Sequence, residues 1–179
     1  MAMSARGVES TGVKPNAAEL VTAIKGTHRA FPTGVTVVTT IVGGEPVGLA
    51  VNAFSSVSLD PPLVMVCVSS TSRTHPHLFV DNPVAINILA AHQESVAMLF
   101  AMSEGDKFAD LDWHAGQTGA PLVDGAAAAF EGRVISRIPA GTHTIFIVEV
   151  VAAGAEPRQA PLLYFGGKFF DPTSLLADD

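Results

Sequence analysis

The segment NAFSSVSLDPP, Asn52 to Pro62, separates two apolar runs, PVGLAV (46–51) and LVMVCV (63–68). Both runs have the composition of buried β-strands. The Asp-Pro-Pro at the end of the segment is typical of a turn, and serine side chains often bond to loop backbone. The polar side chains begin at Asn52, however, which is still inside the strand pattern. Two interpretations therefore stay open: an ordinary turn, or a polar edge that holds a ligand.

The composition predicts one folded domain that hides much of its surface. The chain has 179 residues, of which 48% are hydrophobic and 15% charged, and this argues against disorder. Such an apolar chain favours a large subunit interface. The net charge of −7 opposes nucleic acid as a partner, because phosphate contacts need clustered Lys and Arg. The single cysteine, Cys67, cannot form an internal disulfide, and we expect it to be a buried thiol.

No targeting or membrane segment is predicted. The N-terminus MAMSARGVESTG lacks the apolar core of a signal peptide, and no apolar run approaches the roughly 20 residues of a membrane helix. We therefore expect a cytoplasmic protein with no membrane partner.

The hydrophobic pattern predicts a flexible tail (1–16), one domain (17–171) and a short C-terminal tail (172–179). Residues 17–30 have the spacing of an amphipathic helix that Pro32 would stop, and residues 93–102 form a second helical pattern. Two β-branched runs around Gly43-Gly44 predict a hairpin, and LVMVCV is apolar enough for a strand covered on both faces. A long ordered loop is expected after Gly105, and further strands are predicted at residues 84–89, 130–138, 143–154 and 161–167. Six or seven strands with two or three short helices favour a closed or nearly closed barrel over a parallel sheet.

Two polar clusters are candidate binding sites. In NAFSSVS (52–58), a buried edge with donors and acceptors would suit a flat heterocycle with alternating N–H and C=O groups, such as flavin. In SSTSRTHP (69–76), four hydroxyls and Arg73 before a short helix would make an anion site. The alternative for the second cluster is a simple helix N-cap.

The remaining candidates are weaker. His75 and His77 flank a proline and have no nearby cysteine or carboxylate, so we expect no metal. His143 begins an apolar strand, where it could bind nicotinamide or phosphate, or donate to a loop carbonyl. Trp113 and His114 are interpreted as packing anchors. The motifs GxGxxG, GxSxG, HExxH, CxxC and the P-loop are absent, so Rossmann, hydrolase, zincin, thioredoxin and NTPase functions lack support.

From Phe31 to Phe165 the chain resembles the short-chain flavin reductases, the reductase components of two-component flavin-dependent monooxygenases. The resemblance lies in six collinear segments: FPTGVTVVTT (31–40), GLAVNAFSSVSLDPPLVMVCVSSTSRTHP (48–76), AINIL (85–89), DKFADLDW (106–113), PLVDGAAAAFEGRV (121–134) and GTHTIFIVEV (141–150). It implies a mainly β, single-domain split barrel of the FMN-binding type that forms a homodimer. It also implies that NADH or NADPH reduces FMN or FAD, and that the reduced flavin passes to a separate monooxygenase.

The resemblance also implies a set of site residues. The isoalloxazine and ribityl chain are expected beside Thr33, Gly34, Val35, Thr36, Asn52, Ala53, Phe54, Ser55, Ser56, Val57 and Ser58. The phosphate is expected near Ser70, Ser72 and Arg73, and Asn87, Lys107 and Phe108 would complete the pocket. His143 would lie near the nicotinamide as a positioning residue, although Thr142 stands where the family usually has Asp. Because the cofactor itself carries out hydride transfer, no essential catalytic base is expected.

The sequence leaves two other functions open. The missing Asp beside His143 favours a flavin-binding carrier or sensor without catalysis. A related split-barrel enzyme could instead use a deazaflavin or pyridoxamine phosphate. The sequence does not distinguish FMN from FAD or NADH from NADPH, and it does not reveal whether the flavin stays bound or which oxygenase it serves.

Overall fold

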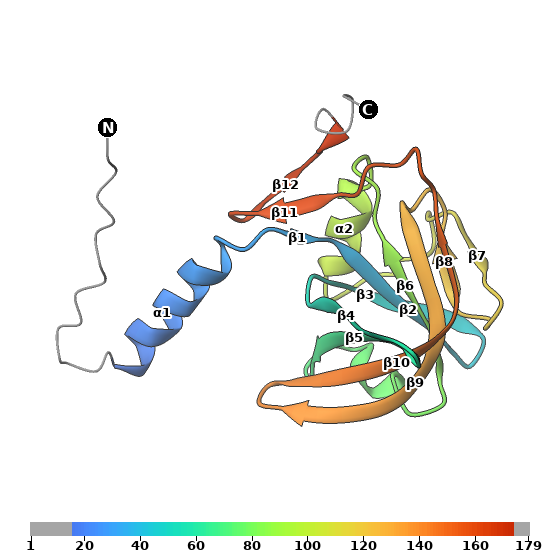
Figure 1. The fold of residues 1–179 in the computed structure, drawn as a ribbon, viewed down its shortest axis with the longest axis horizontal. Helices are drawn as coiled ribbons and strands as arrows, with labels where there is room; N and C mark the ends of the chain where they lie inside the picture. Colours follow the sequence, from blue (N-terminus) through green and yellow to red (C-terminus); the bar gives the residue numbers. More distant parts are fainter. Residues whose placement is uncertain (1–15, 174–179) are drawn as a thin grey trace.

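Residues 16–173 form a strongly curved antiparallel β-sheet flanked by short helices in the computed structural model (Figure 1). Only these residues are described, so the predicted tails fall almost entirely outside the described part of the chain. Asn16 belongs to helix α1 (Ala17–His28), because its side chain accepts the Glu19 N–H at 2.9 Å. The Glu19 carboxylate in turn accepts the Asn16 N–H at 3.0 Å, and this capping box starts the helix where the sequence pattern places it.

The other elements follow in chain order, and strands dominate. They are β1 (Thr33–Gly34), β2 (Thr36–Val42), β3 (Glu45–Val51), β4 (Phe54–Leu59), β5 (Pro62–Ser69), the 3₁₀ helix η1 (His75–His77), β6 (Pro83–Ile88), α2 (Glu94–Ala101), β7 (Trp113–Ala115), β8 (Pro121–Val123), β9 (Ala128–Ala140), β10 (His143–Ala155), β11 (Leu163–Phe165) and β12 (Lys168–Phe170). The predicted long loop after Gly105 therefore contains a short hairpin, β7–β8.

The main sheet has the strand order β3-β2-β6-β9-β10-β5-β4, with every neighbouring pair antiparallel. The β2–β3 hairpin turns at Gly43 and Gly44, which both have positive φ, as a tight two-residue hairpin requires. The two edge strands of the main sheet, β3 and β4, are consecutive in the chain and are joined only by Asn52 and Ala53. The sheet must curl until these edges meet, so the prediction of a barrel rather than a parallel sheet is confirmed.

Two clusters of apolar side chains stabilise this arrangement. The first fills the barrel and includes Val38, Val66, Ile86 and Phe146; the second lies between the barrel wall and α2. The second contains Val37, which points the opposite way from its neighbour Val38, as alternation along a strand requires. Strand β2 is therefore covered on both faces.

Strand β5 differs from its prediction, because only its inner face is covered. Val64, Val66 and Val68 are buried, whereas Met65 and Cys67 on the other face are partly exposed. The expected buried thiol is thus half-buried. The apolar run was correctly interpreted as a strand, but nothing in the described chain lies over its outer face as α2 lies over β2.

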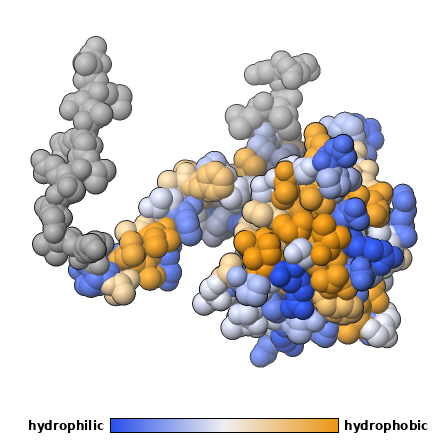
Figure 2. Space-filling model, turned by 60° about the horizontal axis from the view of Figure 1, so that its bottom comes forward, coloured by the Kyte–Doolittle hydropathy of each residue, from blue (hydrophilic) through white to orange (hydrophobic). Residues whose placement is uncertain are grey.

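The uncovered face continues across three strands. Antiparallel register places Cys67 opposite Ile145 and Ile145 opposite Ile138, while Met65 is opposite Ile147. We call these five side chains the outer apolar face. Figure 2, which brings the β9–β10 side of the molecule forward, shows apolar residues gathered over this region.

Helix α1 is likewise uncovered, since it projects away from the barrel and none of its residues is buried (Figure 1). Leu20, Val21 and Ile24 are each about half exposed. The base of the helix is held by the Gly166 N–H, which donates to the Arg29 carbonyl at 3.1 Å. No helix among residues 16–173 is long and apolar enough to cross a membrane.

Candidate functional site

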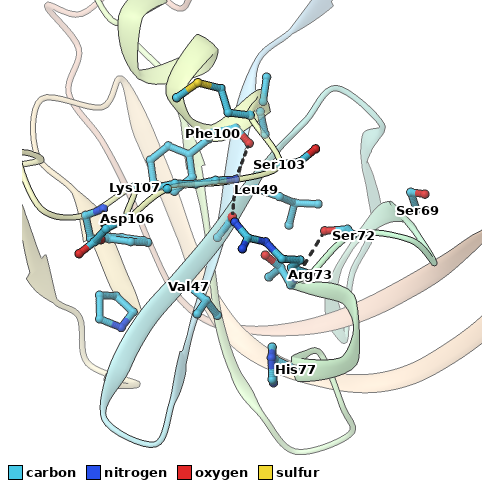
Figure 3. A pocket seen from close by; sticks show the side chains of 18 of the residues that line it. Val47, Leu49, Ser69, Ser72, Arg73, His77, Phe100, Ser103, Asp106 and Lys107 are labelled. Atoms are coloured by element: carbon cyan, nitrogen blue, oxygen red, sulfur yellow. Dashed lines mark hydrogen bonds between the residues drawn. The ribbon is translucent and has the colours of Figure 1, made fainter.

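A cavity of about 550 Å³ opens beside the edge strand β3 (Figure 3). One wall is β3 itself, residues 46–50; a second is the loop after β5, from Ser69 to His77; the third is the end of α2 with the segment that follows it, from Phe100 to Phe108. Gly48 permits the close approach of β3 and α2, because a Cβ there would meet the Phe100 ring at 2.9 Å.

Two cations from different elements face this cavity. Arg73 comes from the loop after β5, and Lys107 from the segment after α2. The Lys107 ammonium donates to the Phe100 carbonyl at 3.0 Å and to the Gly48 carbonyl at 3.3 Å. Burial and, to a smaller extent, the positive charge of Arg73 lower the pKa of Lys107 below its ordinary value.

The positive charge is not neutralised by the protein. Within residues 16–173 neither Arg73 nor Lys107 forms an ion pair, and the nearby Asp106 carboxylate accepts the Phe108 N–H at 3.0 Å. Two unpaired cations in one partly closed cavity make an anion site. This arrangement fits the phosphate of a flavin nucleotide.

Hydroxyl groups add to the anion site. Ser69, Thr71, Ser72 and Thr74 line the cavity, and the Ser72 hydroxyl accepts the Thr74 N–H at 3.2 Å. Thr74 is the N-cap residue of η1 but makes no side-chain capping bond. The alternative interpretation of this cluster as a helix N-cap is therefore wrong.

The structure places Ser72, Arg73, Lys107 and Phe108 together in the cavity, as the resemblance implied, but not Ser70. The Ser70 N–H and hydroxyl both donate to the Thr142 carbonyl, at 3.0 and 2.9 Å. Ser70 thus ties the loop to the β9–β10 turn and does not line the cavity, and its predicted phosphate contact stays a prediction.

The prediction for Asn87 must be corrected. It is completely buried, its side-chain N–H groups donate to the Val37 and Pro121 carbonyls and the Thr39 hydroxyl, and its oxygen accepts the Val123 N–H at 2.9 Å. With its amide saturated, Asn87 joins β6 to β2 and β8 rather than reaching a ligand.

The FPTGV stretch contains both structural residues and residues that a ligand could reach. Val35 and Thr36 are buried, with the Thr36 hydroxyl bonded to the Val51 carbonyl, so their side chains support the fold. Thr33 and Gly34 form β1 against β11 and are partly accessible. The Thr33 hydroxyl oxygen is buried without a hydrogen-bond partner in the described chain, as expected of a group that awaits a ligand or a water.

The segment Asn52 to Ser58 does not line the cavity but begins where the cavity ends. Ala50 on β3 and Ser69 on β5 line the cavity, and the Cys67 N–H donates to the Ala53 carbonyl at 3.0 Å. Asn52, Ala53, Ser56 and Val57 are exposed, Ser55 and Ser58 are partly so, and Phe54 turns inward onto Phe130. An accessible polar edge therefore continues from the cavity along β4.

His143 lies beside the cavity. It is directly opposite Ser69 on the neighbouring strand, so both side chains stand on the same face of the sheet. The Thr142 hydroxyl lies 3.0 Å from His143 Nδ1, a contact that the sequence did not reveal. The residue that replaces the usual Asp thus still has a hydrogen-bonding group at the imidazole.

Several cavity residues were missed, among them Val47, Leu49, His77, Phe100 and Met102. Gly48 inside a strand pattern was the one available signal, because such a glycine often marks a close approach of backbone. The other residues look like ordinary core or turn residues in the sequence. Among residues 16–173, no three His, Cys, Asp or Glu side chains are grouped as a metal site would need.

Comparison with known proteins identifies the family. The model of the flavin reductase like domain matches residues 28–173. The chain belongs to this family. An FMN reductase (NADH), SmoA, from Agrobacterium fabrum is 42% identical over 140 residues, covering 78% of this chain and 79% of that protein. The reductase component of the flavin-dependent trigonelline monooxygenase from Acinetobacter baylyi is 41% identical over 154 residues. The match covers 83% of this chain but only 48% of that longer protein.

Solved structures agree with the fold. The NADH:FAD oxidoreductase SgcE6 of Streptomyces globisporus, in complex with NAD and FAD fragments, superposes with a TM-score of 0.82 at 38% identity, covering 93% of this chain and all of that one. The predicted family, split-barrel fold and class of activity, flavin reduction by NADH, are therefore confirmed.

Proposed function

We propose that the protein is an NADH:flavin oxidoreductase that takes FMN or FAD and passes reduced flavin to a separate monooxygenase. The observation that carries the proposal is the pair of unpaired cations, Arg73 and Lys107, in a cavity that continues into the polar edge at Asn52. Trigonelline monooxygenase, whose reductase component is a relative, provides the precedent for an oxygenase partner.

Different residues of the site bind the phosphate, border the flavin ring and orient the nicotinamide. Arg73, Lys107 and Ser72 hold the phosphate, the segment 52–58 borders the flavin ring, and His143 orients the nicotinamide. The bound nucleotides supply the chemistry: a hydride passes from NADH to oxidised flavin and a solvent proton completes the dihydroflavin, leaving NAD⁺. The protein contributes position and exclusion of water, which need no side-chain acid or base.

The carrier or sensor alternative loses its one supporting feature. It was favoured by the absence of a carboxylate beside His143, but the Thr142 hydroxyl lies 3.0 Å from Nδ1 and can orient the ring. A cytoplasmic location, where NADH is made and consumed, stays a prediction.

The test is NADH oxidation by purified protein without flavin, with FMN and with FAD, followed by loss of NADH absorbance. Stimulation by flavin is expected, whereas flavin binding without oxidation of NADH or NADPH would establish the carrier function.

Arg73→Ala should weaken flavin binding about tenfold or more, since a charged hydrogen bond contributes about 1.5–3 kcal/mol. Hydride transfer at saturating flavin should change less. Arg158→Ala, at a highly exposed arginine outside the cavity, is the matched control; unchanged flavin affinity in Arg73→Ala would refute the phosphate assignment.

We also propose a homodimer. The outer apolar face, with Ile138, Ile145 and Ile147, is uncovered in the single chain, and so are the apolar side chains of α1. Apolar surface of this kind on a folded protein is typical of a subunit interface.

A further inference from the structure

The tip of the β9–β10 hairpin, which carries His143, has little packing of its own. Residues 137–143 are all exposed in the single chain. Gly141 and Thr142 form the turn between the two strands. Gly141 has positive φ, and no atom beyond its chain neighbours lies within 4 Å of the place that a Cβ would take. With so few buried contacts, the position of this tip depends on its hydrogen bonds.

Ser70 supplies the hydrogen bonds that hold this turn from outside the hairpin. Strand β5 ends at Ser69, opposite His143, so the regular pairing of β5 with β10 stops one residue before the turn. The Ser70 N–H and hydroxyl then both donate to the Thr142 carbonyl, at 3.0 and 2.9 Å. Among residues 16–173, no other element forms a hydrogen bond with Gly141 or Thr142. The N–H would be present with any residue except proline, so the hydroxyl is the part that serine adds.

The loop that carries Ser70 is itself well fixed. The Ser72 N–H donates to the Ser69 carbonyl at 3.0 Å, and the Ser69 and Thr71 hydroxyls lie 3.0 Å apart. Ser69 and Thr71 line the cavity, whereas Ser70 between them does not. Within this run of hydroxyl residues, Ser70 is therefore the one that faces the hairpin.

Thr142 connects the held turn to the imidazole. Its carbonyl accepts both bonds from Ser70, and its hydroxyl lies 3.0 Å from His143 Nδ1. A neutral hydrogen bond of this kind is about half as strong as one to a carboxylate. A threonine can therefore orient the ring as well as an aspartate only if its own position is fixed beforehand, which reduces the entropy lost when the bond forms.

We propose that Ser70 is a positioning residue for hydride transfer. By fixing Thr142, whose hydroxyl orients His143, it compensates for the aspartate that usually stands at this point in the family. The inference rests on the proposed function, because it requires His143 to meet the nicotinamide. Hydride transfer needs the reacting atoms about 3–3.5 Å apart, so a small displacement of His143 lowers the use of NADH.

The experiment is anaerobic stopped-flow reduction of flavin by NADH, with the flavin that the wild-type protein reduces faster. Varying NADH gives its dissociation constant and the rate constant at saturation, and a separate titration gives the dissociation constant of the flavin. Ser70→Ala should raise the dissociation constant of NADH about fivefold, which corresponds to about 1 kcal/mol or one neutral hydrogen bond. Flavin affinity should stay unchanged. Ser70→Thr, which keeps the hydroxyl at an exposed position, should restore the wild-type value.

A double-mutant cycle tests whether Ser70 acts through Thr142. In Thr142→Ala the hydroxyl at His143 is already absent, so adding Ser70→Ala should change the dissociation constant of NADH by less than about twofold. Thr118→Ala is the matched control, because its hydroxyl also fixes a turn, by donating to the Glu131 carboxylate at 3.2 Å, but does not line the cavity. It should leave the binding of both nucleotides unchanged. Thermal unfolding measures the stability of every variant.

Three results would overturn the inference. The first is a Ser70→Ala variant that loses flavin affinity as much as NADH affinity, or flavin affinity alone, which would assign Ser70 to the phosphate. The second is a variant that loses only thermal stability, and the third is full additivity of Ser70→Ala and Thr142→Ala. In each case wild-type protein that reduces flavin leaves the proposed function intact. Wild-type protein that oxidises no NADH with either flavin would instead refute the proposed function, and the inference with it.

Discussion

Lys107 shows how one residue can serve both the fold and a ligand. Its ammonium bridges the Phe100 and Gly48 carbonyls and so joins α2 to β3, yet it also faces the cavity beside Arg73. Burial and the neighbouring guanidinium lower its pKa, which means that the charged form is held at a cost. A bound phosphate would remove that cost by supplying the missing negative charge.

This arrangement predicts a pH dependence of flavin binding. The ammonium is protonated below the lowered pKa of Lys107 and loses its charge above it, so FMN affinity should fall as the pH rises through that value, earlier than an ordinary lysine would allow. Lys107→Arg should keep its affinity across the same range, since arginine stays charged. FMN titrations at a series of alkaline pH values provide the measurement; identical pH profiles for wild type and Lys107→Arg would show that Lys107 does not meet the phosphate.

Thr142 gives a second prediction at this scale. If its hydroxyl orients His143, then Thr142→Ala should raise the KM for NADH several-fold, because one hydrogen bond contributes about 1 kcal/mol. Flavin affinity should stay unchanged, and Thr142→Ser should restore the wild-type KM. Steady-state kinetics with varied NADH at saturating flavin would decide, and an unaltered KM in Thr142→Ala would leave His143 without an orienting partner.

At the scale of elements, local patterns predicted which segments are strands, and distant packing decided what each strand meets. The Gly43-Gly44 hairpin follows directly from turn chemistry, and the barrel follows from many short strands. Strand β2 contains three threonines and β5 a continuous apolar run, yet α2 covers the outer face of β2 and nothing described covers that of β5. The predicted two-sided burial of LVMVCV failed for this reason.

The candidate site was predictable to the same extent. The resemblance implied that Arg73 and Lys107 belong to one pocket, and the structure places both in the cavity. Ser70 and Asn87 are neutral polar residues that can bond to backbone as well as to a ligand, and only the fold shows that their partners are Thr142 and Val123. Val47 and His77 carry no pattern of their own; they matter because β3 and η1 face each other across the cavity.

At the scale of the whole molecule, the apolar surfaces that residues 16–173 leave uncovered include the outer apolar face and the side of α1 that carries Leu20 and Ile24. A helix of 12 residues is marginal in water when nothing packs against it. Because α1 is held at its base and directed away from its own barrel, a second copy of the chain is the natural surface for it to contact. One assembly would then cover both surfaces.

The homodimer prediction can be tested at the centre of that interface. Ile147 lies on β10 opposite Met65, so Ile147→Glu would place a charge among apolar side chains of both copies and should convert dimer to monomer. Met98→Glu, on the exposed side of α2, adds the same charge elsewhere and should remain dimeric. Light scattering at micromolar concentration measures the mass, and thermal unfolding confirms that each variant is folded. A monomeric wild type would contradict the homodimer. A dimeric Ile147→Glu would move the interface away from this face and leave the partly exposed isoleucines of β9 and β10 to be explained by another partner.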